Sequence, residues 1–195
     1  MPDLPRIGVV LSTTRAGRFA DRPTEWLMGF ASKRTDLTFE VVDLRDYPMP
    51  FFDEPRSPLM VPPKNEVALR WGKKVAELDG FVFVTAEYNH GIPAVLKNAL
   101  DYAYAEFNRK PAAFVGYGNA AGARAVEQLR LVLAELQVAS LKFAVHIGYA
   151  ELVGMLREGK TFADYPYLEP TVVKMLDDLA WWTKTLRAGR SQSAL

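Results

Sequence analysis

Five short runs of apolar residues recur along the chain, with segments of mixed polarity between them. The runs are rich in β-branched and aromatic residues, which is typical of strands buried on both faces of a sheet. They cover residues 6–11, 37–43, 80–86, 111–117 and 138–147. Elsewhere, apolar residues recur at helical spacing, which predicts amphipathic helices. The predicted helices cover residues 19–34, 64–78, 94–107, 123–137 and 169–187.

The alternation of strand and helix predicts the arrangement of the whole chain. It is typical of an α/β fold in which a parallel sheet carries helices on both faces. Five strands favour the flavodoxin-like order 2-1-3-4-5. In that order the first and third strands are neighbours, and ligands bind where the chain leaves their carboxyl ends. We therefore expect a ligand site formed by the loops after residues 11 and 86.

Three segments lie outside this alternation. Residues 44–63 contain six of the 13 prolines, so regular structure is not expected there. A loop of this length is either a mobile connector or a lid, a binding loop or a partner contact, and Tyr47, Phe51 and Phe52 favour a packed loop. Residues 148–165 are expected to be irregular or a short helix, and residues 188–195 to form a loose tail.

The composition limits the possible functions. With 195 residues, of which 49% are hydrophobic and 24% charged, the chain suits one globular domain covering residues 1–195. The net charge of +1 lacks the basic excess that is typical of nucleic-acid binding. Because cysteine is absent and only two histidines occur, we expect no metal site and no cysteine nucleophile.

No segment of the sequence is suited to a membrane or to export. No apolar run approaches the length of a membrane span. Residues 1–5 have neither a basic start nor a long apolar stretch, so we expect no signal peptide. The absence of cysteine suits a reducing compartment. We therefore predict a cytoplasmic protein without a membrane partner.

The first candidate site follows the first predicted strand. Residues 12–18 read Ser-Thr-Thr-Arg-Ala-Gly-Arg and lead into a predicted helix. Free N–H groups at a helix N-terminus attract anions, Thr13 and Thr14 add hydroxyl donors, and Arg15 offers a fork that fits a phosphate. The pattern predicts a phosphate site. An ordinary helix cap would show the same hydroxyl residues, because Ser and Thr are preferred there.

The second candidate site follows the third predicted strand. Residues 87–91 read Glu-Tyr-Asn-His-Gly. An aromatic side chain can cover a ring, Asn and backbone amides can bind ring N and O atoms, and Gly permits close approach. This composition favours a recognition turn for a flat ligand. The alternatives are a plain turn with a buried Tyr88 and a solvated His90 without a chemical role.

Other motifs are absent or misplaced. The first loop lacks the glycines and lysine of a Walker A loop, and no nucleophile elbow of the form G-x-S-x-G occurs. Residues 116–122 contain glycines spaced G-x-G-x-x-x-G, but they follow the fourth strand, and the next strand offers no acidic residue for a dinucleotide ribose. We interpret these glycines as a tight loop beside a flat ligand.

Three segments together resemble the NADPH-dependent FMN reductase family. Residues 12–18 are similar to its G-S-T-R-x-G-R loop, and residues 117–124, Tyr-Gly-Asn-Ala-Ala-Gly-Ala-Arg, resemble its glycine-rich turn, which begins Y-G-G and ends in arginine. Residues 86–101, Ala-Glu-Tyr-Asn-His-Gly-Ile-Pro-Ala-Val-Leu-Lys-Asn-Ala-Leu-Asp, resemble its longer and more specific P-E-Y-N-x-G-x-P-x-x-L-K-N-A-L-D signature. The likeness runs from about Ile7 to Leu136. This chain departs from the pattern at four glycine or proline positions, which are Ser12, Ala86, Asn119 and Ala123.

The resemblance implies a flavodoxin-like homodimer or homotetramer that binds FMN and uses NAD(P)H to reduce flavins, quinones, azo dyes or metal oxyanions. It implies phosphate contacts from the first loop and ring contacts from the other two. The implied cofactor-binding residues are Thr13, Arg15, Arg18, Glu87, Tyr88, Asn89, His90, Gly91, Tyr117 and Gly118. No catalytic side chain is expected, because a flavin carries the redox chemistry itself.

Two other classes of function stay open at this point. A flavin-binding electron carrier would have no substrate site of its own, although the near-neutral charge disfavours a carrier that meets basic partners. A flavin-free interaction module could share the fold, because fold alone does not establish function.

The helix patterns also indicate an assembly. Leu131 and Trp181 point away from the predicted sheet on their helices, and Tyr102 and Tyr104 add aromatic residues on the third helix. Aromatic residues are enriched at interface cores, and most soluble oligomers have twofold symmetry. We therefore expect a homodimer, or a homotetramer made of dimers, in which the loop 44–63 could approach the partner's flavin.

Overall fold

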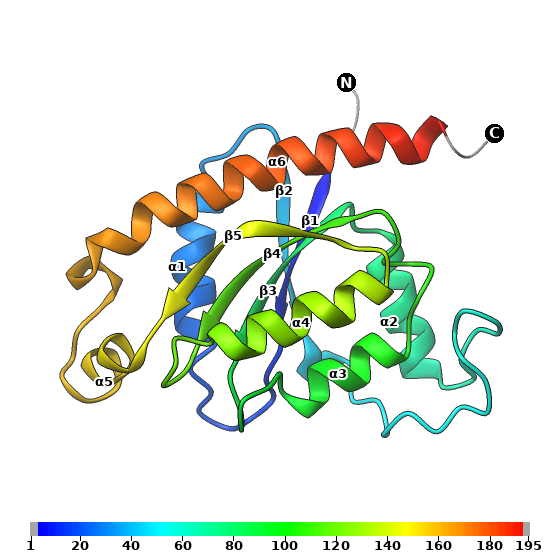
Figure 1. Ribbon diagram of the computed structural model, residues 1–195, viewed down its shortest axis with the longest axis horizontal. Coiled ribbons are helices and arrows are strands. Elements are labelled where there is room, and N and C mark those ends of the chain that lie inside the picture. Colours follow the sequence, from blue (N-terminus) through cyan, green and yellow to red (C-terminus); the bar gives the residue numbers. More distant parts are fainter. Residues whose placement is uncertain (1–3, 193–195) are drawn as a thin grey trace.

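The computed structural model describes residues 4–192 and has a five-stranded parallel sheet at its centre (Figure 1). The strand order is β2-β1-β3-β4-β5, so the predicted flavodoxin-like architecture is confirmed. The strands are β1 (Arg6–Leu11), β2 (Thr38–Asp43), β3 (Gly80–Ala86), β4 (Pro111–Tyr117) and β5 (Ala139–Ile147). Each strand begins within a residue or two of its predicted start because the apolar runs mark the buried segments.

Helices connect the strands. The α-helices are α1 (Asp21–Ala31), α2 (Glu66–Ala76), α3 (Ala94–Asp101), α4 (Ala123–Glu135), α5 (Tyr149–Arg157) and α6 (Glu169–Gln192). Short 3₁₀ turns lie at η1 (Leu44–Asp46), η2 (Phe162–Asp164) and η3 (Pro166–Leu168). The short helix expected within residues 148–165 is therefore present as α5. None of the helices in the described residues is long and apolar enough to span a membrane.

The sheet separates two apolar cores. Successive side chains of a strand point to opposite faces. In β3, Val82 and Val84 pack with residues of α1 and α6, whereas Phe81 and Phe83 pack with residues of α2, α3 and α4. Every residue of β3 and β4 is buried, which explains why these strands read as continuous apolar runs instead of alternating ones.

The parallel register brings three loops to one edge of the sheet. Leu11 pairs with Val84, and Ala86 pairs with Tyr117. The chain therefore leaves β1, β3 and β4 at the same carboxyl edge, and the backbone N–H of Glu87 donates to the Tyr117 carbonyl at 2.9 Å. This edge is where the sequence predicts the ligand site.

The third helix is shorter than predicted, and this removes one expected surface residue. α3 ends at Asp101, and Tyr102 forms its C-cap. Only 1% of Tyr102 is exposed, because its ring packs 5.1 Å from that of Phe52. The prediction that Tyr102 contributes to a contact surface is therefore wrong: a turn follows the helix and directs the ring inward. Tyr104 lies in that turn and is half-buried.

The proline-rich segment 44–63 is packed against the domain at its first half. The amide of Asn98 donates to the Pro50 carbonyl at 2.7 Å, and its oxygen accepts from the Phe52 N–H at 2.9 Å. Tyr47 lies 5.3 Å from Trp71 between ring centroids. The expectation of a packed loop is confirmed for this half, although Phe51 itself is exposed.

The last helix runs past its predicted end. α6 continues from the expected end at residue 187 to Gln192, so residues 188–192 of the predicted loose tail are helical. The remainder of that tail, residues 193–195, lies outside the described residues.

Candidate functional site

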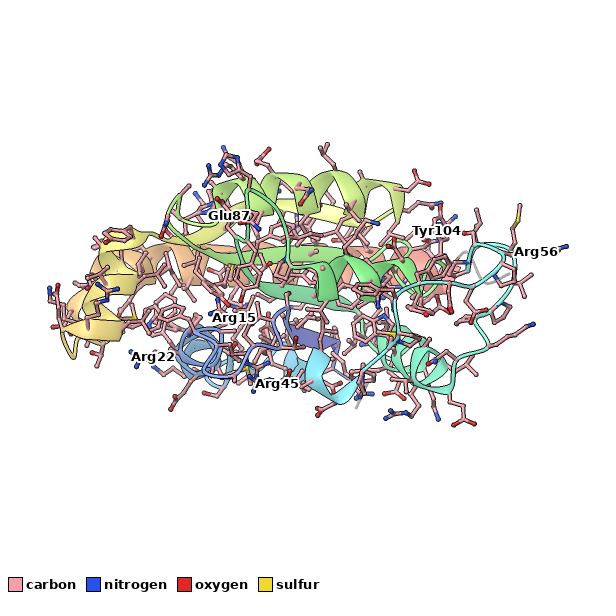
Figure 2. The ribbon with its side chains drawn as sticks, turned by 90° about the horizontal axis from the view of Figure 1, so that it is seen from below. Arg15, Arg22, Arg45, Arg56, Glu87 and Tyr104 are labelled. Atoms are coloured by element: carbon pink, nitrogen blue, oxygen red, sulfur yellow. The ribbon has the colours of Figure 1, made fainter. Side chains whose placement is uncertain are left out.

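A cavity of about 500 Å³ opens at the carboxyl edge of the sheet. Seven of the ten predicted site residues line it, which are Arg15, Glu87, Tyr88, Asn89, His90, Tyr117 and Gly118. Figure 2 shows Arg15 and Glu87 at the same end of the molecule, far from Arg56 in the proline-rich loop. The fold thus brings together most of the residues that the sequence proposes, from three separate loops.

The loop after β1 leaves a run of backbone N–H groups without a protein acceptor. The N–H of Ser12 donates to Val84, and that of Arg18 donates to the Arg15 carbonyl. Between them, the N–H groups of residues 13–17 have no hydrogen-bond acceptor within the part of the chain that the structure describes. Gly17 has a φ of +64°. Consecutive free amides in a turn of this kind form a concave anion-binding nest.

The first helix begins later than predicted, and this changes which groups face the site. α1 starts at Asp21, which places a carboxylate in its first turn. The free N–H groups of residues 13–17 therefore belong to the loop itself and not to the helix terminus. Thr13 is buried, and its hydroxyl lies 3.4 Å from the Tyr117 hydroxyl.

Arg18 holds this loop in place. Its guanidinium bonds to both Asp21 and Asp43 and to the Thr13 carbonyl, at distances of 2.6–2.9 Å. These five bonds use all five N–H donors of the guanidinium. The Asp43 hydrogen bonds raise the pKa of Arg18 above its ordinary value despite partial burial. In this arrangement Arg18 shapes the loop and has no donor left for a ligand.

Arg15, in the same loop, has a different environment. Its side chain is exposed, and its guanidinium lies 5.6 Å from the centre of the Tyr88 ring. No ion pair among residues 4–192 includes Arg15. Arg45 supports the loop from the other side by donating to the carbonyls of Thr14 and Arg15. Arg15 therefore presents free N–H donors at the cavity.

The loop after β3 is a tight hairpin turn. Two backbone hydrogen bonds of 3.0 and 3.1 Å join Tyr88 and Gly91, and the two residues between them, Asn89 and His90, have φ values of +49° and +71°. An added Cβ at Gly91 would lie 2.5 Å from the side-chain oxygen of Gln128, which accepts from the Ile92 N–H at 2.7 Å, so a larger residue would displace Gln128 from this bond. Gly91 thus shapes the turn, while Asn89 and His90 line the cavity.

The side chain of Glu87 is buried and anchors the next loop. Its carboxylate accepts from the Arg124 backbone N–H at 3.0 Å and from Nε at 2.6 Å, and it also pairs with Nη2. Burial alone would raise the pKa of Glu87, but the hydrogen bonds from the Arg124 side chain and backbone lower it overall. The carboxylate therefore fastens the start of α4 to the end of β3.

The third loop forms the remaining wall. Tyr117 is buried, with its ring 5.2 Å from that of Phe19, and burial raises its pKa to about 12. Gly118 lies close to Glu87, because an added Cβ would be 3.0 Å from the Glu87 Cβ. Gly122 has a φ of +67° and leaves no room for a side chain beside the Tyr117 backbone. These glycines form a tight loop at the cavity, as the sequence predicts, and the flat ligand beside it stays a prediction.

Four lining residues were not among the predicted site residues, namely Ala86, Asn119, Arg124 and Leu152. The final arginine of the motif at 117–124 was the available signal for Arg124. No signal pointed to Leu152, because it lies in α5, within a segment whose structure the apolar pattern did not define.

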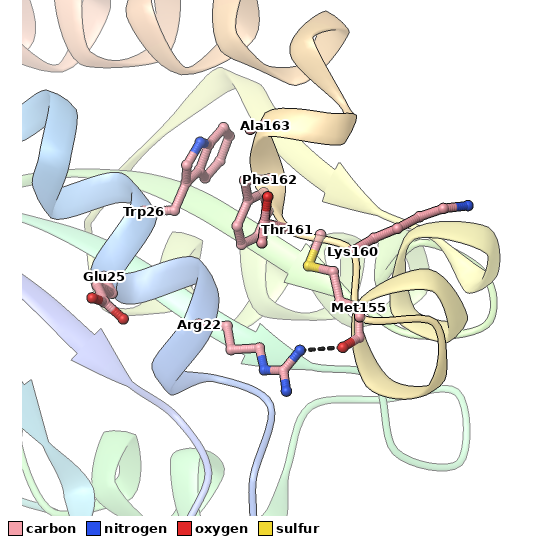
Figure 3. A pocket seen from close by; sticks show the side chains of 9 residues that line it. Arg22, Glu25, Trp26, Met155, Lys160, Thr161, Phe162 and Ala163 are labelled. Atoms are coloured by element: carbon pink, nitrogen blue, oxygen red, sulfur yellow. Dashed lines mark hydrogen bonds between the residues drawn. The ribbon is translucent and has the colours of Figure 1, made fainter.

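A second cavity, of about 590 Å³, lies between α1 and residues 155–163 (Figure 3). Trp26 and Phe162 stack there with ring centroids 4.3 Å apart, and Arg22 donates to the Met155 carbonyl. None of the predicted site residues lines this cavity. Although it is larger, it lacks the set of converging backbone and side-chain donors found at the carboxyl edge, so we assign the candidate site to the carboxyl edge.

Comparison with known proteins gives a consistent picture. Residues 5–151 match the family model described as NADPH-dependent FMN reductase. An NAD(P)H-dependent FMN reductase of Schizosaccharomyces pombe is 40% identical over 136 residues, which are 69% of this chain and 68% of that protein. A 2-hydroxy-1,4-benzoquinone reductase of a Burkholderia species is 33% identical over 140 residues, 68% of this chain and 72% of that one.

A solved structure supports the same fold. The flavoenzyme NAD(P)H:(acceptor) oxidoreductase FerB from Paracoccus denitrificans superimposes with a TM-score of 0.68 and 21% identity, and the match covers 93% of this chain and 98% of FerB.

Proposed function

Because the chain belongs to the NADPH-dependent FMN reductase family, we propose that the cavity at the carboxyl edge binds FMN and that NAD(P)H and a small electron acceptor react there. The family assignment makes the chain an oxidoreductase that uses FMN and NAD(P)H, as the sequence predicts. One observation carries the location of the site: a nest of free amides and an unpaired arginine adjoin a cavity walled by the other two predicted loops.

The residues at the cavity fit FMN. A phosphate needs several N–H donors and a cation, and the amides of residues 13–17 together with Arg15 supply both. Arg18 contributes indirectly by fixing the loop through Asp21 and Asp43. This differs from the direct phosphate contact that the resemblance implies for Arg18.

The flavin ring would lie against the loops after β3 and β4. Tyr88 and Tyr117 offer aromatic contact, and Asn89 offers an amide that can pair with ring N and O atoms. When bound, the flavin supplies hydride acceptance from the nicotinamide and electron delivery to the acceptor. The chain's own residues bind the phosphate and hold the ring.

The acceptor is a small oxidised molecule such as a free flavin, a quinone, an azo compound or a metal oxyanion. The chain is similar to a protein named as a 2-hydroxy-1,4-benzoquinone reductase, so a quinone is the first acceptor to test. The competing function is a flavin-binding electron carrier. The near-neutral net charge of this chain, +1, gives no support for a carrier that docks to a charged protein partner.

A visible spectrum of the purified protein tests this function. We expect a yellow protein whose flavin absorbance bleaches when NADPH or NADH is added without oxygen and returns when a quinone is added. Bleaching by dithionite but by neither nicotinamide would identify an electron carrier. A colourless protein that cannot be loaded with FMN would identify a flavin-free interaction module.

We further propose that the protein is a homodimer or a homotetramer. Leu131 is 76% exposed and Trp181 is 61% exposed, so both lie on the surface as predicted. The exposed Phe51 and Met60 of the proline-rich loop add apolar surface.

Light scattering tests the assembly. It should show an oligomer at micromolar concentration that Leu131→Glu weakens. A monomeric wild type would contradict the assembly, and an unaffected variant would place the interface elsewhere. A cytoplasmic location stays a prediction.

A further inference from the structure

His90 occupies a backbone conformation that usually belongs to glycine. Its two-residue hairpin turn requires positive φ at both central positions, and Asn followed by Gly is the preferred pair. Asn89, with a φ of +49°, satisfies this preference at the first position, whereas His90 at the second has a φ of +71°. Residues other than glycine that are held at positive φ concentrate at functional sites. The presence of His90 at this position places an imidazole at the cavity.

Arg124 determines which ring nitrogen of His90 carries the proton. Nη1 of Arg124 lies 2.7 Å from Nε2 of His90. Because a guanidinium can only donate, Nε2 must accept, and the ring proton therefore resides on Nδ1. Among the described residues, Arg124 is the one hydrogen-bond partner of the ring. The Nδ1–H thus stays available to a ligand.

Glu87 in turn fixes Arg124. The buried carboxylate binds the Arg124 backbone and the Nε and Nη2 side of its guanidinium, which leaves Nη1 directed at His90. The three side chains form a chain of contacts from the end of β3, through the start of α4, to the hairpin turn. Both Arg124 and His90 line the cavity.

We propose that His90 is a catalytic residue whose neutral imidazole donates Nδ1–H to a conjugated carbonyl oxygen in the cavity, and that Arg124 is the positioning residue that sets this tautomer. This inference rests on the proposed function. The carbonyl is one whose oxygen gains negative charge as its conjugated system is reduced, and it belongs either to the flavin ring or to a quinone acceptor. A donor already aimed at such an oxygen stabilises the charge as it develops.

When bound, a reduced flavin would supply a hydride, which carries two electrons and one proton. A quinone that takes up this hydride becomes the hydroquinone monoanion. The Nδ1–H of His90 stabilises the anionic oxygen by a hydrogen bond and keeps its own proton. Water then supplies the second proton. His90 therefore lowers the barrier without itself changing protonation state.

The tautomer can be measured directly because the chain has only two histidines. We expect ¹⁵N–¹H spectra of the apoprotein near pH 7.5 to show His90 as the Nδ1–H tautomer, and Arg124→Gln to shift it toward Nε2–H. His146 is the internal control, because its Nδ1 lies 3.0 Å from the Ala121 carbonyl and should stay unchanged. A charged or Nε2–H His90 in the wild type would overturn the proposal.

Two variants of the holoenzyme identify the carbonyl. If it belongs to a quinone, His90→Gly should slow reoxidation of the reduced enzyme by 1,4-benzoquinone about 10- to 150-fold, the loss expected for one hydrogen bond to a charged oxygen. The variant should have little effect on ferricyanide, which has no carbonyl oxygen to stabilise. If it belongs to the flavin, the midpoint potential of the flavin should fall in His90→Gly. His90→Asn, which retains an N–H donor and suits positive φ, should recover part of either loss.

The structural alternative makes the opposite prediction. If the contact between Arg124 and His90 only joins two loops, His90→Gly will leave both the quinone rate and the flavin potential unchanged, and this result would overturn the proposal. Glycine suits the turn, so the variant is expected to fold. Failure of NAD(P)H to reduce the wild type would refute the proposed function separately, while the tautomer measurement would still test the role of Arg124.

Discussion

The two edges of the sheet both bury charged groups, but they use them differently. At the amino edge, where the strands begin, Lys110 is 6% exposed, and its ammonium donates to the carbonyls of Val75 and Ala76 in the last turn of α2, at 2.7 and 3.3 Å. At the carboxyl edge, the side chains of Arg18 and Glu87 are also buried, and each forms hydrogen bonds with a residue of another strand or loop.

The difference lies in what remains free. At the carboxyl edge, Arg15 and the amides of residues 13–17 have donors without acceptors among residues 4–192, and they lie beside a cavity of about 500 Å³. The hydrogen bonds of Lys110 end on the α2 carbonyls, and it adjoins none of the cavities described above. Buried charge therefore marks a fixed framework in both places, whereas free donors beside a cavity mark a binding site.

The largest effect is expected from removing the framework at the carboxyl edge. Arg18→Met should lower the free energy of unfolding by about 2–4 kcal/mol, because it leaves Asp43 and Asp21 without their cation. Arg15→Met, in the same loop, should change it by less than about 0.5 kcal/mol, since Arg15 is exposed and unpaired. Urea unfolding measures both, and equal losses would contradict the distinction between the two arginines.

At the amino edge, the burial of Lys110 should make the free energy of unfolding depend on pH. Burial lowers the pKa of Lys110 to about 8, whereas a lysine in the unfolded chain titrates near 10.5. Between these values the unfolded state binds more protons, so this residue makes the free energy of unfolding rise with pH from about 8 to about 10.5.

In Lys110→Met, the free energy of unfolding should no longer rise over this pH range. The control is Lys73→Met, which changes an exposed lysine in the last turn of α2 and should keep the rise. Denaturant unfolding of the three proteins at pH 7.5 and 9.5 makes the comparison. A wild type and Lys110→Met variant with the same pH slope would show that Lys110 is not buried as described.

The smallest effect is expected at the second cavity. Arg22→Gln removes a guanidinium that donates to the Met155 carbonyl, and it should change FMN affinity by less than about 2-fold, because the cavity between α1 and residues 155–163 shares no lining residue with the site. Flavin fluorescence titration measures this. A larger loss of affinity would mean that the two cavities act as one site.

The sequence predicted the fold well because its evidence is local. Each buried strand is an uninterrupted apolar run, and the alternation with helices leaves few possible topologies. The end of α3 was mispredicted because Tyr102 is drawn inward by Phe52, a contact between distant segments that helical spacing does not encode.

The site was predicted only in part for the same reason. The three loops could be found because each follows a strand end. The role of Arg18 could not, because Asp43 lies 25 positions away and meets it only in the folded chain. Likewise, Glu87 and Arg124 are 37 positions apart, so the sequence suggested a carboxylate for the ligand where the structure has one that holds α4.

The affinity of Arg15→Ala for FMN and for riboflavin tests the central claim most directly. Arg15 and the free amides are assigned to the phosphate, and a charge-assisted bond contributes about 1.5–3 kcal/mol. The variant should therefore bind FMN about 10- to 150-fold more weakly and bind riboflavin, which lacks the phosphate, as the wild type does. Equal losses for both flavins, or no loss for either, would contradict the assignment of the phosphate to this loop.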